Sequence, residues 1–127
     1  MQKVVLLGST GSVGKSSLEV IEKNKNKYEI ACLVAFSNEK LIKAQAKIHK
    51  KAKIYIEKPK DKLFTKKLID KDDLLKLISS KDVDIVIAAI SGSDGIELIH
   101  HSIISGKKVL IANKEPLVMA GEFLVNE

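Results

Sequence analysis

The 127-residue sequence contains no tryptophan and a single cysteine, and all of its 22 basic residues are lysines. One cysteine excludes a disulfide within the chain. Cys32 lies in the apolar stretch 30–36, which predicts a packed, small hydrophobic side chain. The net charge of +6 could suggest nucleic acid, but there is no arginine to read guanine or to stack on bases. Because the lysines alternate with acids, they predict a solvated surface and no nucleic-acid partner.

Long apolar runs are also missing. No run reaches the roughly 18 residues that a membrane span requires, and the first residues follow a strand pattern and not that of a signal peptide. We therefore expect no membrane association and a cytoplasmic location. The composition, 45% hydrophobic and 30% charged with only two prolines, is typical of a globular protein. A chain of this length can bury an independent core, so residues 1–127 are predicted to form one domain.

Apolar runs alternate with segments of helical periodicity along the chain. The runs predict strands at residues 4–7, 30–35, 54–56, 83–90 and 109–112. The helical pattern covers residues 16–22, 41–48, 74–78 and 96–104, and a last helix is expected from about Lys114. Nearly continuous apolar strands are those buried on both faces. The pattern therefore predicts an α/β fold with a doubly wound, mainly parallel sheet, a Rossmann-type domain. The stretch from Lys58 to Lys71 fits an irregular helix or a loop equally well.

Three residues are predicted to mark the ends of helices. Asp94 and Asn113 are expected to cap the helices that follow them, and Gly106 is expected in the left-handed conformation just after a helix.

The glycine-rich segment 8–14, Gly-Ser-Thr-Gly-Ser-Val-Gly, follows the first predicted strand and precedes a helix. The first N–H groups of a helix have no intrahelical partner and lie at the positive end of its dipole, so they can bind phosphate. Ser9 replaces the glycine that both the Walker A motif and G-x-G-x-x-G require. The G-x-x-G-x-x-G spacing predicts a tight turn at Gly8, phosphate approach at Gly11 and close packing of the helix on the strand at Gly14. A glycine-rich turn without a ligand remains the alternative.

Polar or glycine residues follow three further predicted strands, at 36–38, 91–95 and 113–115. In a parallel sheet these segments meet at one edge, where ligands bind. An NAD site usually has a carboxylate after the second strand, but this chain has Ser37 and Asn38 there, with Lys40 and Lys43 nearby. Hydroxyl, amide and ammonium donors favour a 2′-phosphate and hence NADP. An ordinary Ser-Asn helix cap explains the pair equally well.

No metal site or catalytic group can be assembled from these residues. His100 and His101 are adjacent, so they do not face the same side of a helix, and no cluster of carboxylates stands at a strand end. We therefore expect no metal-ligating and no catalytic residues in this chain. Lys114 is the one ammonium expected at the mouth of the site, where it could contact an anionic substrate.

Taken in order, these motifs resemble the N-terminal NADPH-binding domain of the 1-deoxy-D-xylulose 5-phosphate reductoisomerase family. The resemblance is carried by three segments that together span nearly the whole chain: residues 8–14, residues 83–95 and, most specifically, residues 112–118 with the sequence Ala-Asn-Lys-Glu-Pro-Leu-Val.

The resemblance implies a set of site residues and partners. The NADPH-binding positions would be Thr10, Gly11, Ser12 and Val13 at the pyrophosphate, Phe36, Ser37 and Asn38 around the adenosine ribose and its phosphate, and Asn113 and Glu115 completing the pocket. Lys114 would contact the phosphorylated sugar substrate. The family's metal-binding acids and its lid lie beyond position 127. This chain is therefore expected to be the cofactor domain of a longer, homodimeric enzyme that also binds Mg²⁺ or Mn²⁺.

Three positions depart from the family pattern. Phe36 stands where glycine is frequent, Ser37 where a basic residue is common, and Pro116 where a small hydroxyl residue is usual. Two other functions stay open at this point. One is the cofactor domain of another NADP-dependent dehydrogenase, such as aspartate-semialdehyde dehydrogenase. The other is a stand-alone module that senses NADP(H) without turnover.

Overall fold

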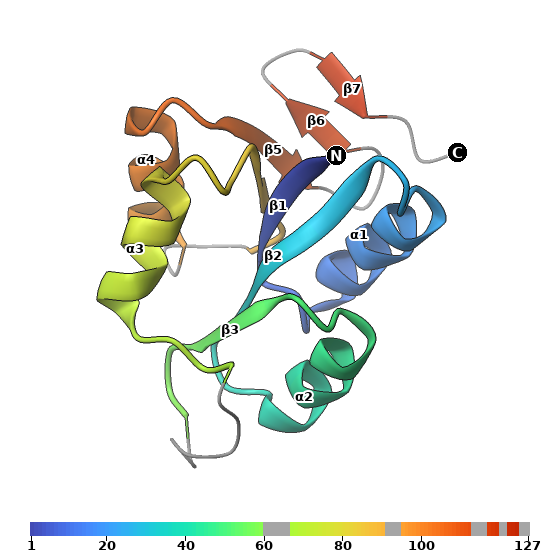
Figure 1. The fold of residues 1–127 in the computed structure, drawn as a ribbon, viewed down its shortest axis with the longest axis vertical. Coiled ribbons are helices and arrows are strands. Elements are labelled where there is room, and N and C mark those ends of the chain that lie inside the picture. Colours follow the sequence, from blue (N-terminus) through green and yellow to red (C-terminus); the bar gives the residue numbers. More distant parts are fainter. Residues whose placement is uncertain (60–66, 91–94, 113–116, 120–121, 125–127) are drawn as a thin grey trace.

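The computed structural model describes residues 1–59, 67–90, 95–112, 117–119 and 122–124. These residues form a single sheet with the strand order β3-β2-β1-β4-β5-β6-β7, flanked by helices (Figure 1). The strands are β1 (Gln2–Leu7), β2 (Tyr28–Ala35), β3 (Lys53–Ile56), β4 (Ile85–Ala88), β5 (Lys108–Ala112), β6 (Leu117–Met119) and β7 (Glu122–Leu124). The helices are α1 (Ser12–Lys23), α2 (Glu39–Ile48), α3 (Lys71–Ser79) and α4 (Ile96–Ile104).

Strands β1 to β5 are parallel, and helices cover both faces of this part of the sheet. Side chains alternate between the two faces of a strand. In β1, Leu6 belongs to the hydrophobic core on the α1 and α2 side, and Leu7 belongs to the core on the α3 and α4 side. Both are fully buried, which stabilises the fold by roughly 1.5–3 kcal/mol for each side chain. The α/β, doubly wound, mainly parallel fold is confirmed.

The strand order reverses direction at β1, which has β2 on one side and β4 on the other. Connections from β1 and from β4 therefore leave the sheet toward opposite faces, and their loops diverge at the carboxyl edge. In open α/β sheets, this switch point is where ligands bind. The glycine-rich segment 8–14 follows β1 directly and lies at this position.

Helix α4 ends at Ile104, and Gly106 follows its C-cap Ser105 in the predicted left-handed conformation. The φ of Gly106 is +76°, its N–H donates to the carbonyl of Ile103 at 3.0 Å, and the N–H of Lys107 donates to Ser102 at 3.1 Å. This pair of bonds is a Schellman motif, which satisfies carbonyls that the helix end would leave unpaired. The predicted caps Asp94 and Asn113 lie outside the described residues.

The expected last helix from about Lys114 is wrong for the residues that are described there. Residues 117–119 and 122–124 form β6 and β7, which extend the sheet in antiparallel orientation, with Ile111 opposite Val118. Strand β5 would otherwise leave a row of unpaired backbone groups at the sheet edge. Pairing with that edge outweighs the weak local preference of the segment for helix.

One helix starts well before its predicted first residue, and the structure describes part of a stretch that the sequence left open. Helix α1 begins at Ser12, four residues earlier than expected, so Val13 and Gly14 are helical. The stretch from Lys58 to Lys71 fits a helix or a loop equally well by its sequence, and its described residues from position 67 on make a backbone bridge to β3. Ile54 N donates to Lys67 O at 2.9 Å, and Ile69 N donates to Ile54 O at 2.8 Å. None of the helices in the described ranges is long and apolar enough to cross a membrane.

Candidate functional site

The turn after β1 is built around Gly8. Its φ of +86° is a conformation that L side chains rarely adopt, and a Cβ there would lie 2.6 Å from the carbonyl oxygen of Ala89. The N–H groups of Gly8 and Ser9 both donate to the carbonyl of Val34 in β2, at 2.8 and 3.0 Å. The predicted tight turn is therefore confirmed, and it is held against two neighbouring strands.

The amino end of α1 follows this turn and has no side-chain cap. The hydrogen bond from Lys15 N to Gly11 O, 2.9 Å long, is the first of the helical pattern. The N–H groups of Ser12, Val13 and Gly14 come before it and therefore have no acceptor within the helix. The first turn contains no acidic residue. Unpaired donors at the positive end of a helix dipole favour an anion. Thr10 and Val13 are half-buried here, whereas Gly11 and Ser12 are exposed.

Gly14 and Gly11 have different surroundings. A Cβ on Gly14 would lie 1.9 Å from the carbonyl oxygen of Gly8, so the first turn of the helix packs directly on the backbone of the glycine turn. This confirms the close packing predicted at Gly14. A Cβ on Gly11 would meet only Gly8 O, at 3.9 Å. The space beside Gly11 is therefore open, as phosphate approach requires.

Ser9 is held by a hydrogen bond from Gln45, a residue that the sequence did not single out. The side-chain Nε2 of Gln45 on α2 donates to the carbonyl oxygen of Ser9 at 2.8 Å, and both residues are buried. Ser9 Oγ and Gln45 Oε1 have no hydrogen-bond partner in the described part of the chain. A signal was available in the sequence, because Gln45 interrupts the apolar stripe that Ile42 and Ala46 form on α2.

At the end of β2, Phe36 is half-buried while Ser37 and Asn38 are exposed. Asn38 is the N-cap of α2, and its Oδ1 accepts a hydrogen bond from the N–H of Leu41 at 3.1 Å. The helix-cap interpretation is thus confirmed for Asn38. This bond uses the acceptor atom of the amide, and the Nδ2 group is a donor that the cap does not use.

The chain that follows β3 lies against the end of β2. Glu57 N donates to Ala35 O at 3.0 Å, and Lys58 N donates to Phe36 O at 2.8 Å. Beside them is a cavity of about 470 Å³ lined by residues of β3 and the start of α3, including Tyr55 and Glu57. The Tyr55 hydroxyl donates to Glu57 Oε2 at 2.5 Å. Burial, followed by this hydrogen bond, raises the pKa of Tyr55 well above its ordinary value.

The first and fourth strands adjoin at the same edge. Ala89 N donates to Leu7 O at 2.8 Å, and a Cβ on Gly8 would lie 2.5 Å from the side chain of Ile90. The structure therefore brings the turn after β1 together with the ends of β2 and β4, as predicted. Residues 91–94 and the predicted site residues Asn113, Lys114 and Glu115 lie outside the described residues.

No group of three or more His, Cys, Asp or Glu side chains that could hold a metal occurs among the residues described. His101 has a packing role instead: its Nε2 lies 2.8 Å from Ser79 Oγ and 3.0 Å from Leu75 O, which links α4 to α3. Cys32 is fully buried, and desolvation raises the pKa of its thiol to about 12. The predicted role of Cys32 as a packed side chain is confirmed.

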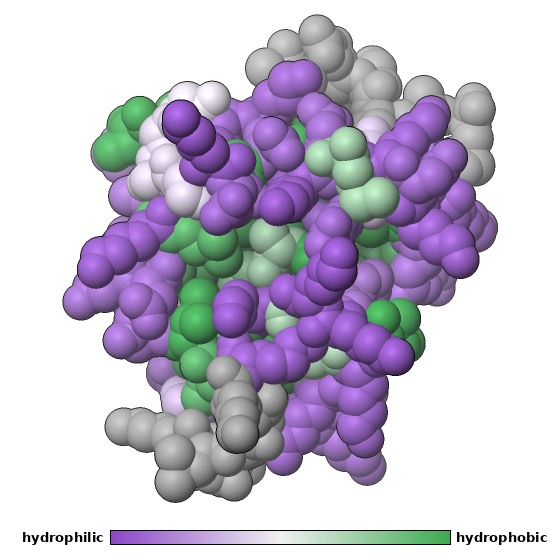
Figure 2. Space-filling view, viewed as in Figure 1, coloured by the Kyte–Doolittle hydropathy of each residue, from purple (hydrophilic) through white to green (hydrophobic). Residues whose placement is uncertain are grey.

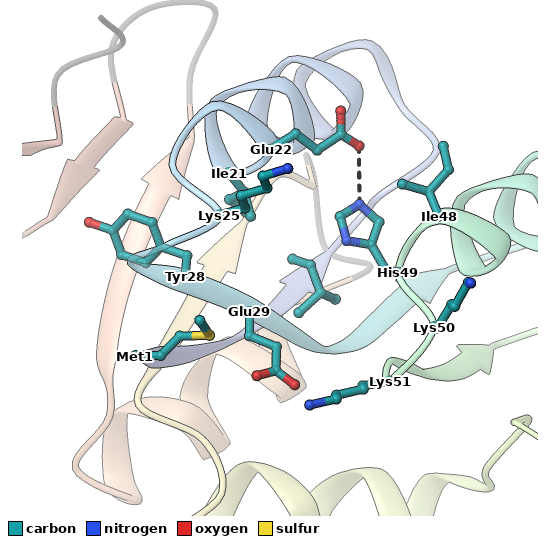
Figure 3. A pocket seen from close by; sticks show the side chains of 11 residues that line it. Met1, Ile21, Glu22, Lys25, Tyr28, Glu29, Ile48, His49, Lys50 and Lys51 are labelled. Atoms are coloured by element: carbon teal, nitrogen blue, oxygen red, sulfur yellow. Dashed lines mark hydrogen bonds and ion pairs between the residues drawn. The ribbon is translucent and has the colours of Figure 1, made fainter.

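A second cavity, of about 590 Å³, opens near the amino ends of β1 and β2, between the final residues of α1 and α2. Figure 3 shows Tyr28 and Met1 on one side of it and the pair of Glu22 and His49, 3.1 Å apart, on the other. None of the predicted site residues that the structure describes lines this cavity. Hydrophilic residues cover most of the face shown in Figure 2, with hydrophobic residues visible between them.

The chain is similar to known proteins over its whole length. A family model described as 1-deoxy-D-xylulose 5-phosphate reductoisomerase matches residues 4–121. Proteins of that name from Wigglesworthia glossinidia brevipalpis and Actinobacillus pleuropneumoniae serotype 5b are 39% and 38% identical to it. Each alignment covers 100% of this chain and 35% of the relative, so the chain spans about a third of the length of these relatives.

Solved structures agree with this match. A reductoisomerase in complex with magnesium superimposes with a TM-score of 0.77 at 31% identity, covering 91% of this chain and 31% of that one. The reductoisomerase of Zymomonas mobilis in complex with NADPH superimposes with a TM-score of 0.75 at 30% identity, covering 89% of this chain and 32% of that one.

Proposed function

This chain belongs to the 1-deoxy-D-xylulose 5-phosphate reductoisomerase family, and from that membership we propose that it forms the NADPH-binding domain of such an oxidoreductase. One structural observation carries the proposal. The uncapped amino end of α1, with open space beside Gly11, stands at the switch point of the sheet. A pyrophosphate binds at this place in dinucleotide-binding folds.

The proposed NADPH-binding residues follow the strand ends. Those at the pyrophosphate are Thr10, Gly11, Ser12 and Val13, where backbone N–H groups donate to phosphate oxygens. Around the adenosine ribose we place Phe36, Ser37 and Asn38, with the side chain of Ser37 and the Nδ2 group of Asn38 as donors. Asn113 and Glu115 complete the pocket, and Lys114 contacts the substrate phosphate or hydroxyl groups.

When bound, NADPH supplies a hydride. The residues of this chain bind the cofactor and orient it, and Gly14 and Gln45 hold the turn in the shape that binding needs. The proposed overall reaction is the rearrangement and reduction of 1-deoxy-D-xylulose 5-phosphate to 2-C-methyl-D-erythritol 4-phosphate. We assign Mg²⁺ or Mn²⁺ binding, the catalytic residues and homodimer formation to the part of the family's sequence that this chain does not cover. We expect the enzyme in the cytoplasm.

Family membership favours this function over the domain of another NADP-dependent dehydrogenase, such as aspartate-semialdehyde dehydrogenase. Titration of the chain with NADPH and NADH, followed by nicotinamide fluorescence, tests the proposal directly. We expect saturable binding with NADPH preferred. Absence of saturable binding of either nucleotide to the folded chain would contradict it.

A variant locates the binding site. Gly11→Val places an isopropyl group in the open space beside α1, so we expect NADPH to bind at least tenfold more weakly, a loss of about 1.4 kcal/mol. The thermal unfolding midpoint should stay close to that of the unmodified chain, because the backbone at Gly11, with φ of −76°, accepts any residue. Ala44→Val, at an exposed position of α2, is the matched control. Equal NADPH affinity in both variants would refute the assignment of the pyrophosphate to this turn.

A further inference from the structure

We propose that Lys58, just after β3, is the cation that binds the 2′-phosphate and thereby sets the preference for NADPH over NADH. This inference rests on the proposed function. The two nucleotides differ only in the phosphate on the adenosine ribose, so discrimination requires positive charge near that group. Phe36, Ser37 and Asn38, at the end of β2, are all uncharged, and the residue that follows them is the acid Glu39. The end of β2 therefore supplies hydrogen-bond donors but no cation.

The fold brings Lys58 to this place from a different strand. Its N–H donates to Phe36 O at 2.8 Å, and the preceding Glu57 N donates to Ala35 O at 3.0 Å. These consecutive hydrogen bonds extend the pairing of β2 with β3 past the last paired residues, Ala35 and Ile56. Neighbouring paired backbones are about 5 Å apart, a distance that the four-carbon stem of a lysine readily spans.

Lys58 is also available to a ligand. It is exposed, and it makes no ion pair with any residue in the described ranges. The adjacent carboxylate of Glu57 accepts the hydroxyl of Tyr55, so this acid already has a partner. An ammonium group is a suitable point charge for a phosphate dianion.

Two other described lysines on this side of the fold have structural partners. The Nζ of Lys67 donates to the carbonyls of Ala46 and His49, at 2.9 and 3.0 Å, which ties the segment after residue 66 to α2. Lys71 forms an ion pair with Glu97 on α4 at 2.9 Å. Lys40, exposed in the first turn of α2, is the strongest competitor for the role.

Four versions of the 127-residue chain test the proposal: the unmodified chain, Lys58→Gln, Lys40→Gln and Lys51→Gln. Lys51 lines the cavity near the amino ends of the strands and serves as a matched control for the loss of one surface charge. Each is titrated with NADPH, NADH, 2′,5′-ADP and 5′-AMP at low and at raised salt. The last two probes report on the ribose phosphate without the nicotinamide.

We expect Lys58→Gln to bind NADPH and 2′,5′-ADP about tenfold more weakly than the unmodified chain. Its affinity for NADH and 5′-AMP should change less than twofold. The salt dependence of NADPH binding should fall, because one charge contact is lost. Lys51→Gln should bind like the unmodified chain. The assignment would be overturned if Lys58→Gln kept the ratio of NADPH affinity to NADH affinity of the unmodified chain. It would also be overturned if only Lys40→Gln lost the preference for NADPH. If the unmodified chain bound neither nucleotide, the proposed function itself would fail, and that outcome is distinct from the other two.

Discussion

The side-chain Nε2 of Gln45 donates a hydrogen bond to the backbone carbonyl of Ser9 at 2.8 Å, joining residues that are 36 positions apart. Ser9 lies in the glycine turn and Gln45 in the middle of α2, and both are buried. The helix that follows the second strand thus holds the turn that follows the first. The turn is positioned by a tertiary contact in addition to its own glycines.

Replacing Gln45 should lower both the stability of the fold and the affinity for NADPH. Gln45→Leu keeps a side chain of similar size but removes the donor, which leaves the buried carbonyl of Ser9 without its side-chain partner. We expect a loss of about 1–2 kcal/mol in the free energy of unfolding. NADPH affinity should fall as well, because the turn is less well held. Urea unfolding and NADPH titration measure the two effects, and an unchanged urea midpoint would show that the hydrogen bond does not stabilise the turn.

Gly14 and Gly11 allow a matched comparison within one motif. A Cβ on Gly14 would lie 1.9 Å from a backbone oxygen, whereas a Cβ on Gly11 would be 3.9 Å from its nearest neighbour. Gly14→Ala should therefore lower the free energy of unfolding by about 1–3 kcal/mol. Gly11→Ala should leave it unchanged or raise it by a few tenths of a kcal/mol, because alanine restricts the unfolded chain. Thermal unfolding of both variants checks this order, and a greater loss in Gly11→Ala would contradict the packing described.

Cys32 should be chemically inert until the protein unfolds. Burial raises the pKa of its thiol from 9.0 to about 12, so the folded chain contains very little reactive thiolate near pH 8. We expect alkylation by iodoacetamide to be slow in buffer and fast in urea, with one group modified per chain. Rapid alkylation under native conditions would show that the core around β2 opens readily.

The same pKa shift predicts a pH dependence. The folded chain holds the Cys32 proton more tightly than the unfolded chain, so the contribution of the neutral thiol is complete below pH 9 and is lost as the pH rises toward 12. Cys32→Ala lacks this titration. Between pH 8 and 10, the stability of the unmodified chain should therefore fall more steeply than that of the variant.

Much of the fold could be predicted because its signals are local. Apolar runs such as 4–7 and 30–35 are buried on both faces of the sheet, and a run of consecutive apolar residues is visible in the sequence itself. The turn at Gly8 and the helix end at Gly106 were also predictable, because a left-handed backbone favours glycine wherever it occurs. The strand-turn-helix order around residues 8–14 was enough to place the candidate phosphate site.

Other features depended on contacts between distant segments. Strand β6 pairs with the free edge of β5, and β7 pairs with β6, which local helix or strand preference does not reveal. The hydrogen bond between Gln45 and Ser9, and the position of Lys58 beside Phe36, each join two elements that only the folded sheet brings together. Residue spacing therefore determined the parallel strands β1 to β5, the helices α1 to α4 and the glycine turn, because those depend on neighbours along the chain. The tertiary structure decided which side chains surround the turn, because that depends on the packing of α2 and β3 against β1 and β2.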